Sequence, residues 1–494
     1  MDIRRPASAV IAILALLAAS CVSEPPPPAE PVASAAAAPP APETVVAPEA
    51  VQPAAAVVQP ELTPEQKESQ ELDVIYDLVG EGDLGAAEER LASLAEERPQ
   101  NKDYPVQRAA LLLSLGRYDE ARALLKAALA DDDSNVEALF VLAMVERYTG
   151  DDKAFRAAAE AVLARDPAHA GANAAMGDIW YEGKDYRKAE ASYAAALRTD
   201  PENIEALLGS ARVQYRREDY DAAVANLDKA IALAPDDPLP FLDRSRVLYQ
   251  MGRYGDCERD LDEAVRLAPD SPWNYLERGR LYMDTGRPTL AEADFDRSIE
   301  LDPGYFLPYI YRAAIYEAGG RDEEALADYR VITGLYPDYW YAFESIGVLA
   351  WRRGYWKESY AGFDRAATYT KAHPEYYIAA SLALMRAGET KAAKDYASKY
   401  LPRIDKEKLP IQWLMLRLVL DQTDMSSELE LRLGSERSLD LKASMLFYLG
   451  SYWLARDQPG LGEKYVRMSL EAERVGTIEW RMAEAELKRL AASE

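Results

Sequence analysis

Cysteine and histidine are scarce in this chain. Its 494 residues include two cysteines, Cys21 and Cys257, and two histidines, His169 and His373. This scarcity excludes a disulfide scaffold and an ordinary zinc site built from four neighbouring Cys and His ligands. The sequence also lacks a glycine-rich phosphate loop and an identifiable set of acid, base and nucleophile. We therefore expect no metal, no cofactor and no enzymatic activity.

Basic residues are outnumbered by acidic ones. The chain has 57 Lys and Arg against 84 Asp and Glu, and its formal net charge is -27. A chain this acidic is repelled by phosphate backbones, so we expect no nucleic-acid partner. Hydrophobic residues nevertheless make up 49% of the chain, which is enough for a large folded body.

The N-terminal residues have the pattern of a targeting segment. Arg4 and Arg5 precede an apolar run, residues 10–19, which is too short to be a permanent membrane-spanning helix. Small residues then lead directly to Cys21. Residues 17–21, Leu-Ala-Ala-Ser-Cys, resemble the lipobox of a bacterial lipoprotein signal peptide, although leucine stands one residue earlier than in the usual pattern.

This resemblance implies that a signal peptide, residues 1–20, is cleaved and that Cys21 is lipidated. Lipid on Cys21 would anchor the protein to a membrane of the bacterial cell envelope, where it would face the periplasm or the exterior. The alternative is an ordinary secretory signal followed by an incidental cysteine. Residues 21–65 are rich in Pro and Ala and predict a disordered tether of partly polyproline II character.

From about residue 66 the chain repeats every 34 residues. A position within the repeat is called a phase below, and prolines, glycines and alanines each mark one phase. The prolines are Pro167, Pro201, Pro235, Pro269, Pro303 and Pro337. The glycines are Gly82, Gly116, Gly150, Gly252, Gly286, Gly320, Gly354 and Gly388. The alanines are Ala87, Ala121, Ala189, Ala223, Ala291, Ala325 and Ala393. Each unit predicts two helices, with glycine allowing a left-handed exit from the first and proline ending the second.

These units resemble the tetratricopeptide repeat family. The unit at 272–305 carries most of the family signature, namely Gly279, Tyr282, Gly286, Ala291, Phe295 and Pro303. We count about ten units within residues 66–407. The resemblance implies an all-α fold, an α-α superhelix whose concave groove is lined mainly by the first helix of each unit. It also implies binding of a protein or peptide partner rather than catalysis.

Two further segments follow the repeats. Residues 408–442 predict a degenerate helical segment without the repeat signature, and residues 443–494 predict a final hairpin and a capping helix. In that last helix Trp480, Ala483, Leu487 and Leu490 fall on one face. We expect this apolar face to cover the end of the solenoid, which would otherwise be exposed.

Arginine and aspartate recur together 16 residues apart, in the pairs Arg244 and Asp260, Arg278 and Asp294, and Arg312 and Asp328. Three other units lack this arginine, and they also lack the aspartate. Such joint occurrence favours a charge-assisted pair between the two helices of one hairpin. We interpret these six residues as structural rather than functional.

A second set of residues predicts the binding site. Arg212, Arg246 and Arg280 share one phase, and Tyr181, Tyr215, Tyr249 and Met283 share the phase three residues later. By the resemblance, both phases face the concave groove, where Trp273, Tyr341 and Trp351 are also expected. Arg and Tyr are typical of binding hot spots, so we predict that these ten residues contact the partner. The alternative is ordinary surface residues paired with local acids such as Glu218 or Asp284.

Two expectations follow for this groove. Leu208, Leu242 and Leu276 stand where the family's carboxylate clamp has a basic residue, so a clamp for peptide C-termini is not expected. Replacing the three arginines with alanine should leave folding nearly intact, because groove residues contribute little to helix packing.

The leading hypothesis is a lipid-anchored extracytoplasmic scaffold that binds a protein or peptide in cell-envelope assembly or secretion. One alternative is a ligand-binding or enzymatic lipoprotein whose site lies in the irregular region 408–442. A deep pocket with convergent polar groups in that region would favour this alternative. A third hypothesis is that the solenoid mainly self-associates.

Overall fold

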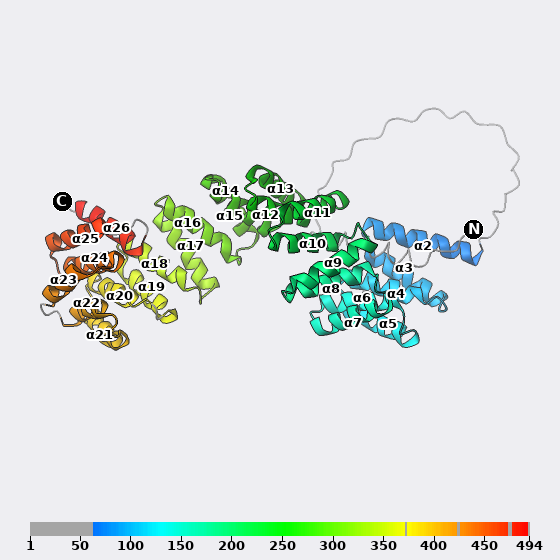
Figure 1. The fold of residues 1–494 in the computed structure, drawn as a ribbon, viewed down its shortest axis with the longest axis horizontal. Helices are drawn as coiled ribbons and strands as arrows, with labels where there is room; N and C mark the ends of the chain where they lie inside the picture. Colours follow the sequence, from blue (N-terminus) through cyan, green and yellow to red (C-terminus); the bar gives the residue numbers. More distant parts are fainter. Residues whose placement is uncertain (1–62, 371–372, 422–424, 473–476, 493–494) are drawn as a thin grey trace, which may run out of the picture. The chain divides into compact units, whose positions relative to one another are not determined.

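The computed structural model describes residues 63–370, 373–421, 425–472 and 477–492 (Figure 1). All regular secondary structure in these ranges is helical, which confirms the predicted fold class. The signal peptide, Cys21 and nearly all of the tether lie outside the described residues. None of the described helices is both long enough and apolar enough to cross a membrane.

The described chain forms two compact units that meet in sequence after Leu267. The first unit consists of six successive helical hairpins. Its helices are α2 (Pro64–Glu81), α3 (Leu84–Glu97), α4 (Asp103–Ser114), α5 (Tyr118–Asp131), α6 (Val136–Tyr148), α7 (Asp152–Arg165), α8 (Ala170–Glu182), α9 (Tyr186–Thr199), α10 (Ile204–Arg216), α11 (Tyr220–Leu233), α12 (Pro238–Gln250) and α13 (Tyr254–Leu267).

The second unit begins at Ala268 and continues the hairpin pattern before it changes. Four hairpins come first: α14 (Pro272–Asp284), α15 (Pro288–Leu301), α16 (Phe306–Ala318), α17 (Asp322–Leu335), α18 (Trp340–Arg353), α19 (Trp356–Tyr369), α20 (Glu375–Arg386) and α21 (Thr390–Tyr400). A short 3-10 turn and five helices follow: α22 (Pro410–Asp421), α23 (Ser426–Ser435), α24 (Leu439–Ala455), α25 (Pro459–Ala472) and α26 (Ile478–Ala491).

The turn between the two helices of a hairpin depends on a left-handed residue. All eight glycines of the glycine phase have a positive φ, between 70° and 83°, as the sequence predicts. The two repeats without this glycine place Lys184 and Glu218 in the same conformation, with φ of 61° and 62°. A side chain at such a φ is strained, so these two turns are made at a cost that the glycine turns avoid.

Small residues allow the two helices of a hairpin to approach closely. The seven alanines of the alanine phase are fully buried, and Cys257 takes the same phase and is also buried. Gly279 of α14 lies against Phe295 of α15 so closely that an added Cβ would come within 2.6 Å of its ring. Gly279 therefore has no room for a side chain beside Phe295, because protein interiors leave no spare volume.

The helix starts also repeat. A side chain just before the first helix of a unit accepts a hydrogen bond from the backbone N–H three residues on, as Asn135 does for α6, His169 for α8 and Asn203 for α10. Thr63 makes a capping box with Gln66, and Pro64 is the first residue of α2. The array thus begins two residues before the predicted boundary at residue 66.

The segment 408–442 is an ordinary part of the core. Met415 and Val419 of α22 and Leu429 of α23 are fully buried in one cluster with Phe447 of α24. The last hairpin starts at Leu439 rather than at residue 443, because Ser438 caps α24. The final helix, α26, packs against α25, α24 and also α18, which lies far earlier in the chain.

Candidate partner-binding face

The first helices of the hairpins carry the predicted site residues. In the first unit, Tyr181 lies on α8, Arg212 and Tyr215 on α10, and Arg246 and Tyr249 on α12. The surface made by these phases of the first helices is called the first-helix face below. Because residues three apart lie on one side of a helix, Arg212 and Tyr215 share this face, as do Arg246 and Tyr249.

A buried carboxylate links the two arginines of the first unit. Asp243 of α12 is 7% exposed and accepts a bond from Arg212 Nε at 2.9 Å and from Arg246 Nη1 at 3.0 Å. The side chains of Arg212 and Arg246 remain 38% and 45% exposed. Their partner is therefore neither Glu218 nor Asp284, the acids considered from the sequence. Since each guanidinium has five N–H donors, both arginines keep donors for a ligand.

This contact argues against the expectation that alanine at these positions leaves folding intact. Removing both Arg212 and Arg246 would leave Asp243 buried without either cation. An uncompensated buried charge is strongly destabilising. Loss of partner binding in such a variant would thus be confounded by loss of stability.

Asp178 stands at the arginine phase of α8 and belongs to a similar network. It accepts from the Tyr193 hydroxyl at 2.7 Å and pairs with Arg147 Nη2 at 2.9 Å. Burial together with the Asp178 charge raises the pKa of Tyr193, so the tyrosine stays protonated and donates. The first-helix face of this unit therefore carries alternating acidic and basic side chains.

The tyrosines of the first unit do not stand singly. Each packs against the tyrosine that begins the second helix of its own hairpin, with ring centroids 5.4–5.9 Å apart. The pairs are Tyr181 with Tyr186, Tyr215 with Tyr220, and Tyr249 with Tyr254. Such pairing holds the rings in place before a ligand arrives, which lowers the entropy cost of binding.

The remaining predicted residues lie in the second unit and are described by themselves. Arg280 pairs with Glu277 at 3.2 Å and lies over the ring of Tyr311. Met283 packs against the same cluster of rings. Trp273 is 40% exposed and stacks on Tyr305. Trp273, Arg280 and Met283 thus all lie on α14, and Trp273 and Arg280 each contact a tyrosine ring at the start of α16 or within it.

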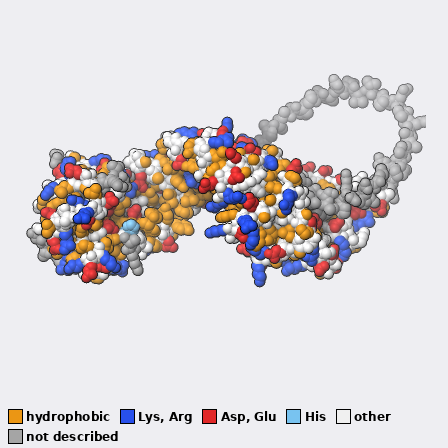
Figure 2. Space-filling view, viewed as in Figure 1, with side chains coloured by type: hydrophobic (Ala, Val, Ile, Leu, Met, Phe, Trp, Pro, Cys, Tyr) orange, Lys and Arg blue, Asp and Glu red, His pale blue; other side chains and the backbone are white. Residues whose placement is uncertain are grey.

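Tyr341 begins a further aromatic group of the second unit. It is 53% exposed and stacks on Trp340 with ring centroids 3.7 Å apart. Phe306 and Tyr336 stack nearby, and Leu335 of α17 is exposed. Figure 2 shows hydrophobic side chains gathered around the helices that Figure 1 labels α16 and α17.

Trp351 is covered within the chain, so the prediction that it is an exposed residue of the groove is wrong. Its side chain is fully buried, and its indole N–H donates to Glu486 of α26 at 2.9 Å. Phe447 of α24 packs against the ring with centroids 5.6 Å apart. Trp351 stands at the same phase as Tyr215, but α26 covers Trp351 in the second unit.

The six residues interpreted as structural form the three pairs. Arg244 Nε and Nη2 donate to Asp260 at 2.8 and 2.7 Å, and the other two pairs have the same two-bond geometry. The aspartates are buried. Burial raises the pKa of Asp328 even though Arg312 opposes the shift. Each pair joins the two helices of one hairpin, which explains why arginine and aspartate occur together.

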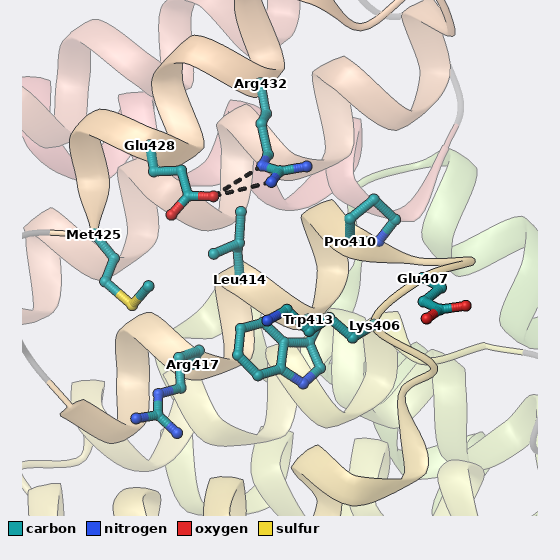
Figure 3. A pocket seen from close by; sticks show the side chains of 9 residues that line it. All are labelled: Lys406, Glu407, Pro410, Trp413, Leu414, Arg417, Met425, Glu428 and Arg432. Carbon is teal, nitrogen blue, oxygen red and sulfur yellow. Dashed lines mark hydrogen bonds and ion pairs between the residues drawn. The ribbon is translucent and has the colours of Figure 1, made fainter.

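The region 408–442 holds an open pocket of about 1030 Å³ (Figure 3). Glu428 and Arg432 line it and bond to each other at 3.0 Å. The Lys406 ammonium lies 4.7 Å from the centre of the Trp413 ring. Glu428 and Arg432 are thus paired with each other, and Lys406 lies over a ring, so these three charges do not converge on an empty point. Within the described ranges, no group of three or more His, Cys, Asp or Glu is arranged to hold a metal ion.

Sequence reasoning missed Asp243, the second tyrosine of each pair and Glu486. Tyr186, Tyr220 and Tyr254 recur 34 residues apart, and this signal could have placed them beside the first-helix tyrosines. Asp243 lies three residues before Arg246, which is the usual spacing of a helical ion pair. Nothing in the local sequence of Glu486 indicates contact with Trp351.

Comparison with known families agrees with this architecture. Two tetratricopeptide repeat profiles match residues 78–145 and 181–241, and residues 155–204, 242–306 and 276–340. Together these matches cover more than half of the chain, which therefore belongs to the tetratricopeptide repeat family. Proteins of this family are generally non-enzymatic scaffolds that bind proteins or peptides, and the present chain has that scaffold fold. A search of curated protein sequences found no match.

Several solved structures are similar to parts of the chain. A tetratricopeptide repeat protein from Parabacteroides merdae is 20% identical with a TM-score of 0.38, covering 51% of this chain and 99% of its own. PilF from Pseudomonas aeruginosa is 21% identical with a TM-score of 0.39, covering 44% and 99%. PilW, a type IV pilus biogenesis factor, is 19% identical with a TM-score of 0.38, covering 42% and 96%.

Proposed function

We propose that this protein is a lipid-anchored extracytoplasmic scaffold of the bacterial cell envelope. It captures a protein or peptide partner on the first-helix face of its first unit and serves envelope assembly or secretion. The observation that carries the proposal is the pair of partly exposed arginines, Arg212 and Arg246, which buried Asp243 holds on the same face as the paired tyrosines Tyr215 and Tyr249.

The chemistry of this face suits a polypeptide. The remaining guanidinium N–H groups of Arg212 and Arg246 suit carboxylates or backbone carbonyls, and the three tyrosine pairs offer flat rings for apolar groups. Asp243 fixes the position of both guanidinium groups, so less rotamer entropy is lost when they bind. The expected partner segment is extended or helical and exposes acidic side chains or free carbonyls. No cofactor is part of this proposal.

Binding measurements with surface variants test the site. The partner is first identified by co-purification from cross-linked cells, with the native chain as bait. Tyr215→Ala and Tyr249→Ala should each weaken its binding about 30-fold, since truncating a hot-spot residue commonly costs about 2 kcal/mol. Leu233→Ala and Arg266→Ala change exposed residues of the second helices α11 and α13 and are the matched controls. Equal effects of all four substitutions would refute the site.

Membrane attachment is tested separately at Cys21. Replacing Cys21 with Ser should move the protein from the membrane fraction to the soluble extracytoplasmic fraction, because the lipid supplies the anchoring energy. A serine variant that stays in the membrane fraction would show that Cys21 is not the anchor. The binding experiment above does not depend on this result.

The competing hypothesis of a ligand-binding or enzymatic site in region 408–442 is less well supported. The pocket of Figure 3 is open, Glu428 and Arg432 neutralise each other, and Lys406 lies over Trp413. It offers no acid and base facing a common point. Unchanged partner capture by a Trp413→Ala variant would favour the scaffold over this alternative.

A further inference from the structure

The last helix of the chain lies across the first-helix face of the second unit. Glu486 of α26 is 1% exposed and accepts the indole N–H of Trp351 on α18 at 2.9 Å and Nη2 of Arg386 on α20 at 3.2 Å. Arg489 reaches back to Glu486 at 2.6 Å and donates to the Trp351 carbonyl at 2.9 Å. A cation at that carbonyl also complements the C-terminal end of α18.

Two more contacts of α26 reach α16 and α24. Arg481 pairs with Glu317 of α16. Glu479 accepts from the Tyr448 hydroxyl of α24 at 2.8 Å. Burial and the Glu479 charge raise the pKa of Tyr448, which keeps this donor protonated. These side-chain contacts join α26 to four helices, and all four are first helices of hairpins: α16, α18, α20 and α24.

The phases covered by α26 are those of the proposed site in the first unit. Glu317 and Trp351 stand at the phase of Tyr215, three and four repeats later, and Arg386 stands at the phase of Arg216. A first-helix face that carries rings and cations in one unit is thus occupied by a helix in the other. The second unit shows what kind of segment such a face holds.

The buried side of α26 carries acidic as well as apolar residues. Its buried residues are Glu479, Met482, Ala483 and Glu486, so two of the four are carboxylates. Trp480 and Leu487, expected from the sequence to cover the solenoid end, are only partly buried. The expectation of an apolar cap is therefore confirmed only in part: Ala483 is fully buried and Leu487 packs against the core, but two carboxylates share the buried side. Buried ion pairs add little net stability, but removing one partner leaves a buried charge that is strongly destabilising.

We propose that the first-helix face from α16 to α24 is a binding site for an acidic amphipathic helix, which α26 occupies within the chain. A partner helix with carboxylates seven residues apart and apolar residues between them displaces α26. The donors that select the carboxylates are the Trp351 indole N–H, the Arg386 guanidinium and the Tyr448 hydroxyl. Because α26 belongs to the same chain, its effective concentration at the site is about millimolar. A partner helix therefore binds only if its affinity and concentration together outcompete α26.

A labelled peptide of residues 477–492 tests the proposal in the full-length chain. The intact chain should bind no peptide at micromolar concentration, because α26 fills the site. A chain with Met482→Asp and Ala483→Asp, both fully buried in α26, should release the helix and bind the peptide. A peptide carrying Glu486→Gln should bind this chain at least tenfold more weakly, since it loses the charge-assisted bond to Arg386. Failure of the folded double variant to bind the unmodified peptide would overturn the proposal.

A matched variant isolates the donor on the receiving side. Trp351→Phe keeps an aromatic ring in the same place but removes the indole N–H that Glu486 accepts. In the chain with the released helix, this change should weaken binding of the unmodified peptide several-fold. It should weaken binding of the Glu486→Gln peptide less strongly. Equally weakened binding of both peptides would show that the indole N–H does not recognise the Glu486 carboxylate, which contradicts the proposal.

Hydrogen exchange of the unmodified chain decides the same question without substitutions. If α26 is displaceable, its amides should exchange at least 100-fold faster than those of α18 and α20, by opening of α26 alone. Exchange of α26 together with α18 and α20 in one opening would show that α26 is a permanent part of the core, and the proposal would fail.

This site is independent of the Arg212 and Arg246 surface. Peptide binding at α16–α24 is measured with a segment of this chain, so it neither requires nor identifies the partner of the first unit. Failure here would leave the proposed function of the first unit unaffected. Failure of the Tyr215 and Tyr249 variants would likewise leave the α26 proposal unaffected.

Discussion

Asp243 provides a sharp test of how the first-helix face is held together. It is 7% exposed and accepts a hydrogen bond from Arg212 and another from Arg246. Replacing one arginine with alanine leaves the other in place, so each single change should cost about 1 kcal/mol. Replacing both leaves a buried carboxylate without a cation, which should cost about 3–5 kcal/mol. The double change should therefore exceed the sum of the single changes by about 1–3 kcal/mol.

Native-state hydrogen exchange is the suitable assay, because the stability of a repeat array is nearly the sum of the stabilities of its repeats and of the interfaces between them. The loss should appear in the amides of α10 to α13 and should be absent from α2 to α5. A global melting temperature would blur this pattern, since long repeat arrays depart from two-state unfolding.

The rescue variant separates a charge effect from a packing effect. Adding Asp243→Asn to the double arginine variant removes the stranded charge and should recover most of the excess loss. If the two arginine substitutions prove additive within about 0.5 kcal/mol, Asp243 does not couple them and the reasoning is refuted. The same follows if Asp243→Asn fails to rescue the double variant.

Three further predictions concern the repeat units. Lys184→Gly should stabilise the first unit by about 1 kcal/mol in urea denaturation, because glycine adopts the left-handed φ of this position without strain. Gly252→Ala should destabilise the unit by a similar amount, because it places a Cβ at a left-handed φ. Burial lowers the pKa of His169 below 6.5, and its Nδ1 caps α8, so stability present at neutral pH should fall as pH drops below about 6.5; His169→Asn should abolish this dependence. Arg278→Leu should cost about 3 kcal/mol by stranding buried Asp294, and adding Asp294→Leu should recover part of that loss; strict additivity would contradict the pairing.

The hairpins themselves were predictable because the forces that define them are local. A glycine phase, an alanine phase and a proline phase set the turn, the close approach and the helix end, and each acts within one repeat. The turns at Lys184 and Glu218 show that the repeat geometry holds even where the local residue opposes it. Packing of neighbouring hairpins overrides a cost of about 1–2 kcal/mol at a single residue.

The site was only partly predictable, because phase specifies a helix face but not what packs on it. Tyr215 and Trp351 share a phase, yet one remains partly accessible and the other is fully buried. The difference comes from Glu486, which contacts Trp351 from 135 positions further along the chain. No repeat pattern contains such a contact, because α26 lies outside the repeats.

The acidic side of α26 follows the same logic. Spacing of apolar residues selects Trp480, Ala483, Leu487 and Leu490 as the buried face, since the burial of apolar surface drives the packing of an ordinary helix. The receiving face, however, presents an indole N–H, a guanidinium and a hydroxyl, and these donors would be left unsatisfied under an apolar helix. Burying Glu479 and Glu486 satisfies them, so the donors of the receiving surface determine the orientation of the helix. A first-helix face with fixed donors therefore selects its occupant by carboxylate position, and apolar area alone does not predict what binds there.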